Sequence, residues 1–267
     1  MGSFIQLKNF EALLPYANMF KEGLITTVLL AFFTVLLGFV LGLVLSVMRM
    51  SNIRPFLWLA HAFPGTFGFF ERDKKSGLLR DSGFLYHLGR FNPLAFLATA
   101  YVEVIRSTPV LVQVMVIYFG VFSQLFELPS FKIFGFIAFN RFFPGVVALA
   151  MNSGAYLCEI IRSGLQSVEG GQTEAARSLG LSQLQNMRFI ILPQAIKNIL
   201  PAIANEFAIT YTIGVQDIMA MVQAIKSASY IIMEPLLVAT ALYFCLCFPL
   251  SKLIAYIERR MSRGDRR

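Results

Sequence analysis

The chain has 267 residues, of which 57% are hydrophobic, and its mean hydropathy is +0.66. A soluble domain of this length does not carry so much apolar surface, so the composition excludes that class and predicts an integral membrane protein. Lys and Arg number 23 against 15 Asp and Glu. We attribute the resulting net charge of +8 to membrane topology rather than to nucleic-acid binding.

Five apolar segments predict an all-α integral membrane fold with five transmembrane helices. The first, residues 24–48, is an uncharged run of 25 residues, which is long enough to cross a hydrocarbon core of roughly 30 Å. The others are expected at residues 107–126, 142–158, 198–213 and 234–251. Gly and Pro punctuate these runs and none alternates as a barrel strand does, so helices are favoured.

Two glycines of the first predicted span stand one helical turn apart. Gly38 and Gly42 form a small-xxx-small pair, a spacing that lets a second helix approach closely. Glycine is also simply frequent in membrane helices. The sequence leaves both explanations open.

The distribution of basic residues predicts the orientation of the spans. Segments 49–106, 159–197 and 252–267 together hold 18 Lys and Arg residues, whereas segments 1–23, 127–141 and 214–234 hold 5. Cytoplasmic loops carry the excess of Lys and Arg. We therefore expect the N-terminus outside, and the C-terminus, with its basic tail 263–267, inside.

The chain divides into four predicted parts. Residues 1–55 contain the N-terminal segment and the first span, and residues 98–262 contain the remaining spans. Between them, residues 56–97 have an apolar stretch too short to cross a membrane, followed by a charged stretch. We expect this part to be a cytoplasmic or interfacial insertion. The basic tail, 263–267, is the fourth part.

Residues 170–193 form a polar segment between apolar runs, here called the helix corner. Residues 173–179 predict a short helix, and Gly180 supplies the left-handed geometry that ends it. Ser182 begins a second helix, with Gln185 in capping-box register, that is expected to end near Pro193. Pattern alone leaves two interpretations, a cytoplasmic docking knob or an ordinary loop on the membrane surface.

Three acidic positions lie in or near the predicted membrane. Glu103 with Arg106, and Glu159 with Arg162, are spaced i,i+3 at predicted cytoplasmic boundaries, where pairing or snorkelling is favoured over substrate contact. Glu206 lies near the middle of the fourth predicted span. An acid at that depth is costly, so Glu206 either lines a path for a solute or holds a structural hydrogen bond.

The helix corner resembles the signature of ABC-importer permease subunits. Glu174-Ala175-Ala176, Gly180 four residues on, and Ile190-x-Leu192-Pro193 occupy its fixed positions. The surrounding sequence is similar to the polar-amino-acid branch (the histidine, glutamine and arginine type) at residues 101–109 with Gln113, 154–162, 191–195 and 205–207. The resemblance covers roughly residues 10–55 and 98–262.

This resemblance implies a type I importer fold in the bacterial cytoplasmic membrane. The chain would pair with an identical or sister permease and receive amino acids from an extracytoplasmic binding protein. Its helix corner would dock on a cytoplasmic ABC ATPase dimer that binds ATP–Mg. The chain itself would hold no cofactor, metal or catalytic residue, and would contact membrane lipid but no nucleic acid. No Gly-Lys dipeptide occurs in it, so it lacks a phosphate-binding loop of that type.

Two groups of candidate site residues follow. The resemblance assigns ATPase coupling to seven positions: Glu174, Ala175, Ala176, Gly180, Ile190, Leu192 and Pro193. Polar residues at expected membrane depth form the candidate translocation path: Gln113, Asn152, Tyr156, Asn205 and Glu206.

Two other functions stay open at this point. About seven residues typical of the family are missing after Phe207, which shortens the fourth span and suggests a degenerate or scaffold permease. An ion-coupled secondary transporter would instead act without ATP. Internal repeats typical of such transporters are not evident.

Overall fold

The computed structural model describes residues 7–51, 91–209 and 217–262, with side chains described at all of these except 204–209 and 261–262. It is mostly helical, as predicted. The elements are α1 (Leu7–Glu11), η1 (Leu14–Tyr16), α2 (Ala17–Met50), α5 (Pro93–Ser107), α6 (Val110–Met115), η2 (Val116–Phe122), α7 (Ser123–Leu125), β1 (Lys132–Ile133), β2 (Ile137–Ala138), α8 (Phe139–Gln166), α9 (Gly170–Ser178), α10 (Gln183–Asn186), η3 (Met187–Ile191), α11 (Leu192–Ile209), α12 (Ile218–Ser229) and α13 (Met233–Ser262). The expected insertion lies mostly outside the described residues.

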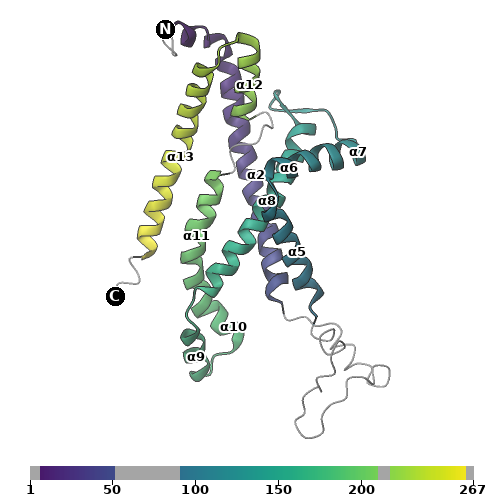
Figure 1. Cartoon of the computed structure of the whole chain (residues 1–267). Helices are drawn as coiled ribbons and strands as arrows, with labels where there is room; N and C mark the ends of the chain where they lie inside the picture. The colour runs from purple at the N-terminus through teal and green to yellow at the C-terminus, as the bar shows by residue number, and fades with distance from the viewer. Residues whose placement is uncertain (1–6, 52–90, 210–216, 263–267) are drawn as a thin grey trace.

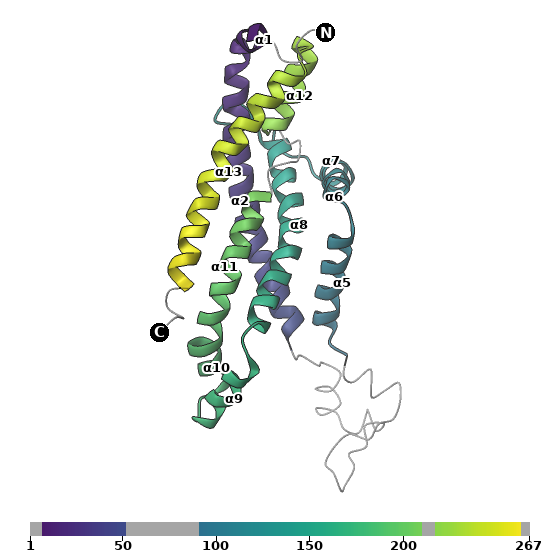
Figure 2. The ribbon, with the colours of Figure 1, turned by 60° about the vertical axis from the view of Figure 1, so that its left-hand side comes forward.

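The long helices run roughly side by side between two ends of the molecule (Figure 1). The described start of the chain, α12 and the beginning of α13 lie at the upper end, and the α9–α10 region lies at the lower end (Figure 2). The end of α13 also points toward the lower end, so the two termini lie toward opposite ends of the bundle.

Three helices in the described ranges are long and apolar enough to cross a membrane: residues 7–50, Phe139–Gln166 and Met233–Arg260. They contain the first, third and fifth predicted spans. The count becomes four if α5 and the helical segment 110–125 are taken as one bent span. The predicted fourth span begins in α11, which is helical but is not among these three helices.

The predicted second span was wrong in its boundaries. Helix α5 occupies Pro93–Ser107 and packs against α2 and α8, so part of the expected cytoplasmic segment is a helix of the bundle. The chain then turns by 110° at Thr108–Pro109 into the segment expected to be a straight span. Pro109 disfavours a helical conformation at the preceding residue, and Thr108 is accordingly extended, with ψ 144°.

Glycines allow α2 and α8 to pack closely. A Cβ built on Gly42 would lie 2.8 Å from the Leu157 Cβ, and one on Gly38 would lie 3.0 Å from the Ser153 Cβ. On the opposite helix, a Cβ on Gly154 would lie 2.8 Å from Leu41. This geometry supports close approach as the reason for the two glycines. The α2–α8 pair is the centre of the bundle.

Candidate functional site

The helix corner closes with the geometry that its sequence predicts. Gly180 has φ +80°, and the peptide N–H groups of Leu181 and Gly180 donate to the carbonyls of Ala176 and Arg177 at 3.1 and 2.9 Å. These two bonds form the turn that commonly ends a helix at a left-handed glycine. Ser182 and Gln185 form the reciprocal capping box at the start of α10. Both hydrogen-bond patterns hold α9 and α10 at an angle.

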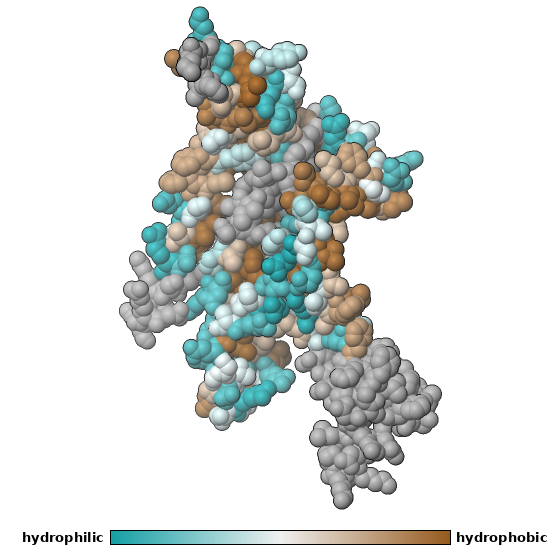
Figure 3. Space-filling view, in the orientation of Figure 1, coloured by the Kyte–Doolittle hydropathy of each residue, from teal (hydrophilic) through white to brown (hydrophobic). Residues whose placement is uncertain are grey.

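The helix corner presents one acidic and several apolar side chains to solvent. Glu174 and Ala175 are exposed, whereas Ala176 is buried within the corner. Leu179, Leu184 and Phe189 are 81%, 78% and 63% exposed. At this end of the molecule the surface is otherwise largely hydrophilic to neutral (Figure 3). Exposed apolar side chains rimmed by polar ones are typical of a protein-binding surface.

We expected the second helix of the corner to end near Pro193, but the helix continues past that residue. α10 continues through a π-helical turn, Met187–Ile191, directly into α11, with Leu192 still in helical geometry. Wide turns of this kind interrupt the regular hydrogen-bond ladder, which Pro193 cannot join because it has no N–H. The Gln194 side chain donates to the carbonyl of Ile190 at 3.0 Å. The corner is therefore the lower end of α11 rather than a separate knob.

Two contacts fasten the base of the corner between α8 and α11. Asn198 donates from Nδ2 to the Ser167 hydroxyl at 2.7 Å, and that hydroxyl donates to the Gly164 carbonyl at 2.7 Å. Ile199 packs so closely on Gly164 that a Cβ there would lie 2.2 Å from it. These contacts join the end of α8, which precedes the corner, to α11, which follows it.

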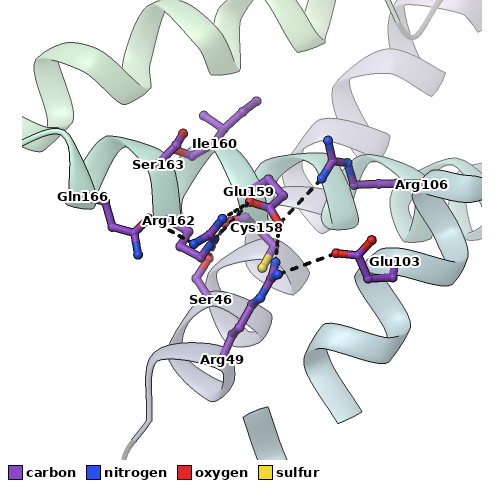
Figure 4. A network of polar contacts seen from close by, with 10 residues as sticks. All are labelled: Ser46, Arg49, Glu103, Arg106, Cys158, Glu159, Ile160, Arg162, Ser163 and Gln166. Atoms are coloured by element: carbon purple, nitrogen blue, oxygen red, sulfur yellow. Dashed lines mark hydrogen bonds and ion pairs between the residues drawn. The ribbon is translucent and has the colours of Figure 1, made fainter. Parts of the chain in front are cut away.

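A single carboxylate, that of Glu159 on α8, lies at the centre of an ionic network near the same end (Figure 4). Its Oε1 accepts from Arg49 of α2 and lies 3.6 Å from Nη1 of Arg106 of α5. Its Oε2 is contacted by Nη2 and Nε of Arg162 at 3.0 and 3.1 Å. Arg49 also lies 3.7 Å from Glu103. The Glu159–Arg162 pair was expected, whereas Glu103 pairs with Arg49 rather than with Arg106.

Gln113 and Asn152, two of the candidate path residues, contact each other. Asn152 donates from Nδ2 to the side-chain oxygen of Gln113 at 2.9 Å. The Gln113 amide nitrogen lies 2.6 Å from the Ile105 carbonyl and 2.9 Å from that of Thr108, at the end of α5. These carbonyls lack helical partners because the helix breaks there. The pair therefore supports the bend.

The remaining candidate path residues are not part of this pair. Tyr156 is 37% exposed, and the Arg106 guanidinium lies 5.5 Å from the centre of its ring. Asn205 and Glu206 belong to α11 by backbone, but their side chains lie outside the described ones.

Sequence reasoning missed three contributors: Arg49, Ser167 and Asn198. Arg49 closes the longest uncharged run of the sequence, a position at which a lone cation has few partners other than a neighbouring helix. Ser167 and Asn198 carried no signal, because their contact depends on tertiary packing alone. Within the described ranges no group of three or more His, Cys, Asp and Glu side chains has metal-binding geometry.

Comparisons with known proteins place the whole chain among its relatives. The family model described as "binding-protein-dependent transport system inner membrane component" matches residues 83–263. The arginine transport system permease protein ArtQ of Bacillus subtilis (strain 168) is 32% identical over 264 residues, which cover 96% of this chain and 99% of ArtQ. The probable glutamine ABC transporter permease protein GlnM of the same organism is 35% identical over 181 residues, which cover 65% and 79%. In a solved amino acid ABC transporter with histidines, one chain is 36% identical, with a TM-score of 0.70 and coverage of 94% and 98%.

Proposed function

The chain belongs to the family of binding-protein-dependent transport system inner membrane components, as an amino-acid ABC transporter permease, and we propose that it is the permease subunit of an ATP-driven importer of polar amino acids. The proteins named in the comparisons concern arginine, glutamine and histidines. These share a polar side chain, which supports the polar-amino-acid class without selecting one member.

The observation that carries the proposal is the exposed surface of the helix corner. Its apolar side chains, led by Leu179 and Leu184, have no cover within the described chain, and Glu174 lies exposed on the adjoining helix. We propose that this surface docks on a separate cytoplasmic ATPase dimer, which binds ATP–Mg. Closure of that dimer would move the corner, and the bundle would switch access as a rigid body.

The distribution of charge supports a cytoplasmic location for the corner. It shares the lower end of the molecule with the ends of α2 and α13, which carry basic residues (Figure 2). Moving α5 from the loop into the bundle removes only Arg106 from the basic side, so the predicted orientation is retained. We propose a bacterial inner membrane, with the N-terminus outside and the C-terminus inside.

Two further partners complete the proposed complex. A second permease, identical or sister, would lie beside this chain, and an extracytoplasmic binding protein would deliver the amino acid at the upper end. Gln113, Asn152, Tyr156, Asn205 and Glu206 remain the proposed path. Of these, Gln113 and Asn152 already support the bend, so any contact with the solute would be made from a braced position.

The degenerate-permease alternative gains no support. It depended on a shortened fourth span, and residues 210–216 of that region lie outside the described residues. The alignment with ArtQ covers 99% of that permease.

The docking surface can be tested by reversing one charge. We expect Glu174→Lys to lower the amount of ATPase that co-purifies with the tagged chain, because the side chain is exposed on the corner and holds no span in place. Glu11→Lys is the matched control, since Glu11 is also exposed but lies at the opposite end of the molecule. Equal recovery of the ATPase with both variants would refute docking through Glu174. Loss of amino-acid-stimulated ATP hydrolysis should accompany loss of the partner.

A further inference from the structure

One carboxylate joins three helices at the level just above the helix corner. Glu159 belongs to α8, Arg49 to α2 and Arg106 to α5, and both carboxylate oxygens are occupied by guanidinium contacts. The side chains of Arg49 and Glu159 are only 15% and 17% exposed. Within the described residues, α5 and α8 have one ion pair, Arg106–Glu159, and the Arg106 guanidinium also lies 5.5 Å from the centre of the Tyr156 ring. Figure 4 shows the guanidinium groups approaching Glu159 from different sides.

Removing the negative charge would leave the guanidinium groups facing one another. Breaking a partly buried ion pair by deleting one partner is costly because the remaining charge loses its compensation. Glu103 cannot replace Glu159, because its side chain is 61% exposed and its one ion pair in the described chain is with Arg49, at 3.7 Å. The ionic join between the three helices therefore depends on the single carboxylate of Glu159, whereas apolar packing of α5 on α8 and the Tyr101–Met151 hydrogen bond do not require it.

A chain of hydrogen bonds connects the same carboxylate to the end of α8, just before the helix corner. Arg162, which contacts Glu159 through two nitrogens, also donates to Gln166, the last residue of α8, at 3.0 Å. Four residues later α9 begins at Gly170, and Ser167 between them is bonded to Asn198 of α11. A displacement of the corner thus reaches the end of α8 through short, hydrogen-bonded steps.

We infer that Glu159 is a positioning residue that helps α5 to follow the movement of the helix corner. This rests on the proposed function of the corner as the ATPase-docking surface. Helix α2 already packs tightly on α8, but α5 carries the bend and the Gln113–Asn152 contact beyond it. Through Arg106, Glu159 ties the last turn of α5, next to the bend, to α8, so the bend moves together with the corner.

The test compares two variants, Glu159→Gln and Glu103→Gln. The second removes a negative charge from the same network but leaves the contacts of Glu159 with Arg49 and Arg106 in place. Spin labels on Phe96→Cys of α5 and Gln172→Cys of α9, both exposed positions, report the distance between the two elements in the assembled complex. Cys245 and Cys247 are replaced by Ser in this background, and buried Cys158 is left in place. In the same preparations, amino-acid uptake and ATP hydrolysis are measured in proteoliposomes.

We expect Glu159→Gln to broaden the distance distribution and to lower the amino acid transported per ATP hydrolysed by about tenfold, within the range by which mutations along a coupling route act. Glu103→Gln should keep both readouts near those of the parent. An unchanged distribution, or an unchanged transport-to-hydrolysis ratio, in Glu159→Gln would overturn the inference. If that variant does not assemble, Arg49→Gln/Glu159→Gln removes the most buried of the uncompensated cations and must show the same broadening.

Failure of the proposed function has a separate signature. A parent complex with no amino-acid-stimulated hydrolysis and no uptake would refute the importer. The spin-label distances would still decide whether Glu159 joins α5 to the corner, because they require neither transport nor substrate.

Discussion

The close packing of α2 on α8 can be tested by adding one methyl group at the contact. In Gly42→Ala, the new Cβ would lie 2.8 Å from the Leu157 Cβ, 3.0 Å from the Cys158 nitrogen and 3.0 Å from the Gly154 carbonyl oxygen. Ordinary carbon contacts begin at about 3.5 Å. Two of the three neighbours are backbone atoms, which have no rotamer to change, so the helices themselves must separate.

The expected cost of Gly42→Ala follows from that overlap. Forcing an extra methyl into a well-packed interior costs about 1–3 kcal/mol. For a chain of this size, each kcal/mol lowers the unfolding temperature by about 2–4 °C. We therefore expect the detergent-solubilised protein to melt about 2–12 °C below the parent. The buried Ser46 hydroxyl, which donates to the Cys158 carbonyl at 3.0 Å, should lose its partner as the helices part.

Gly120→Ala supplies the control for this measurement. Gly120 also lies in a helical segment, but the nearest atom to an added Cβ is a Val116 methyl at 4.0 Å. Alanine is a better helix former than glycine, so this variant should melt at or slightly above the parent temperature. If Gly42→Ala unfolds at the same temperature as Gly120→Ala, the reasoning from close helix approach is wrong.

Two further changes probe the helix corner and the bend. Gly180→Ala places a side chain at φ +80°, which costs about 1–2 kcal/mol, so tryptic cleavage after the neighbouring Arg177 should become several times faster; an unchanged cleavage rate would contradict the strained turn. Asn152→Leu removes the donor to buried Gln113 and should destabilise the chain by about 1–3 kcal/mol, measured by thermal unfolding. Full stability of Asn152→Leu would show that the bend stands without this contact.

The helix corner was well predicted because its determinants are local. A left-handed glycine and a Ser-x-x-Gln capping box fix the backbone within a few residues, and both lie where expected. The end of the second helix was mispredicted at Pro193, since proline is usually read as a helix stop. Whether a π-helical turn takes up the missing hydrogen bond depends on packing further along α11.

Long apolar runs predicted the existence of spans better than their boundaries. Residues 107–126 are uncharged throughout, so hydropathy alone placed the span on the second of two helical elements that meet at 110° and left the first, α5, in the cytoplasmic segment. The signal for the break was nevertheless present in Thr108–Pro109. Likewise, the i,i+3 spacing predicted two separate ion pairs within helices. In the structure Arg49, which is distant in sequence, contacts both Glu103 and Glu159 and so joins them in one network.

The glycine contact between α2 and α8 also sets a rule for sequence divergence. Position 42 faces Leu157 and the backbone at Gly154 with no room for a side chain, and position 154 faces Leu41 in the same way. A larger residue at one site is compatible with the fold only if the opposing helix retreats or loses volume. Substitutions on these two helices should therefore occur in compensating pairs across the family.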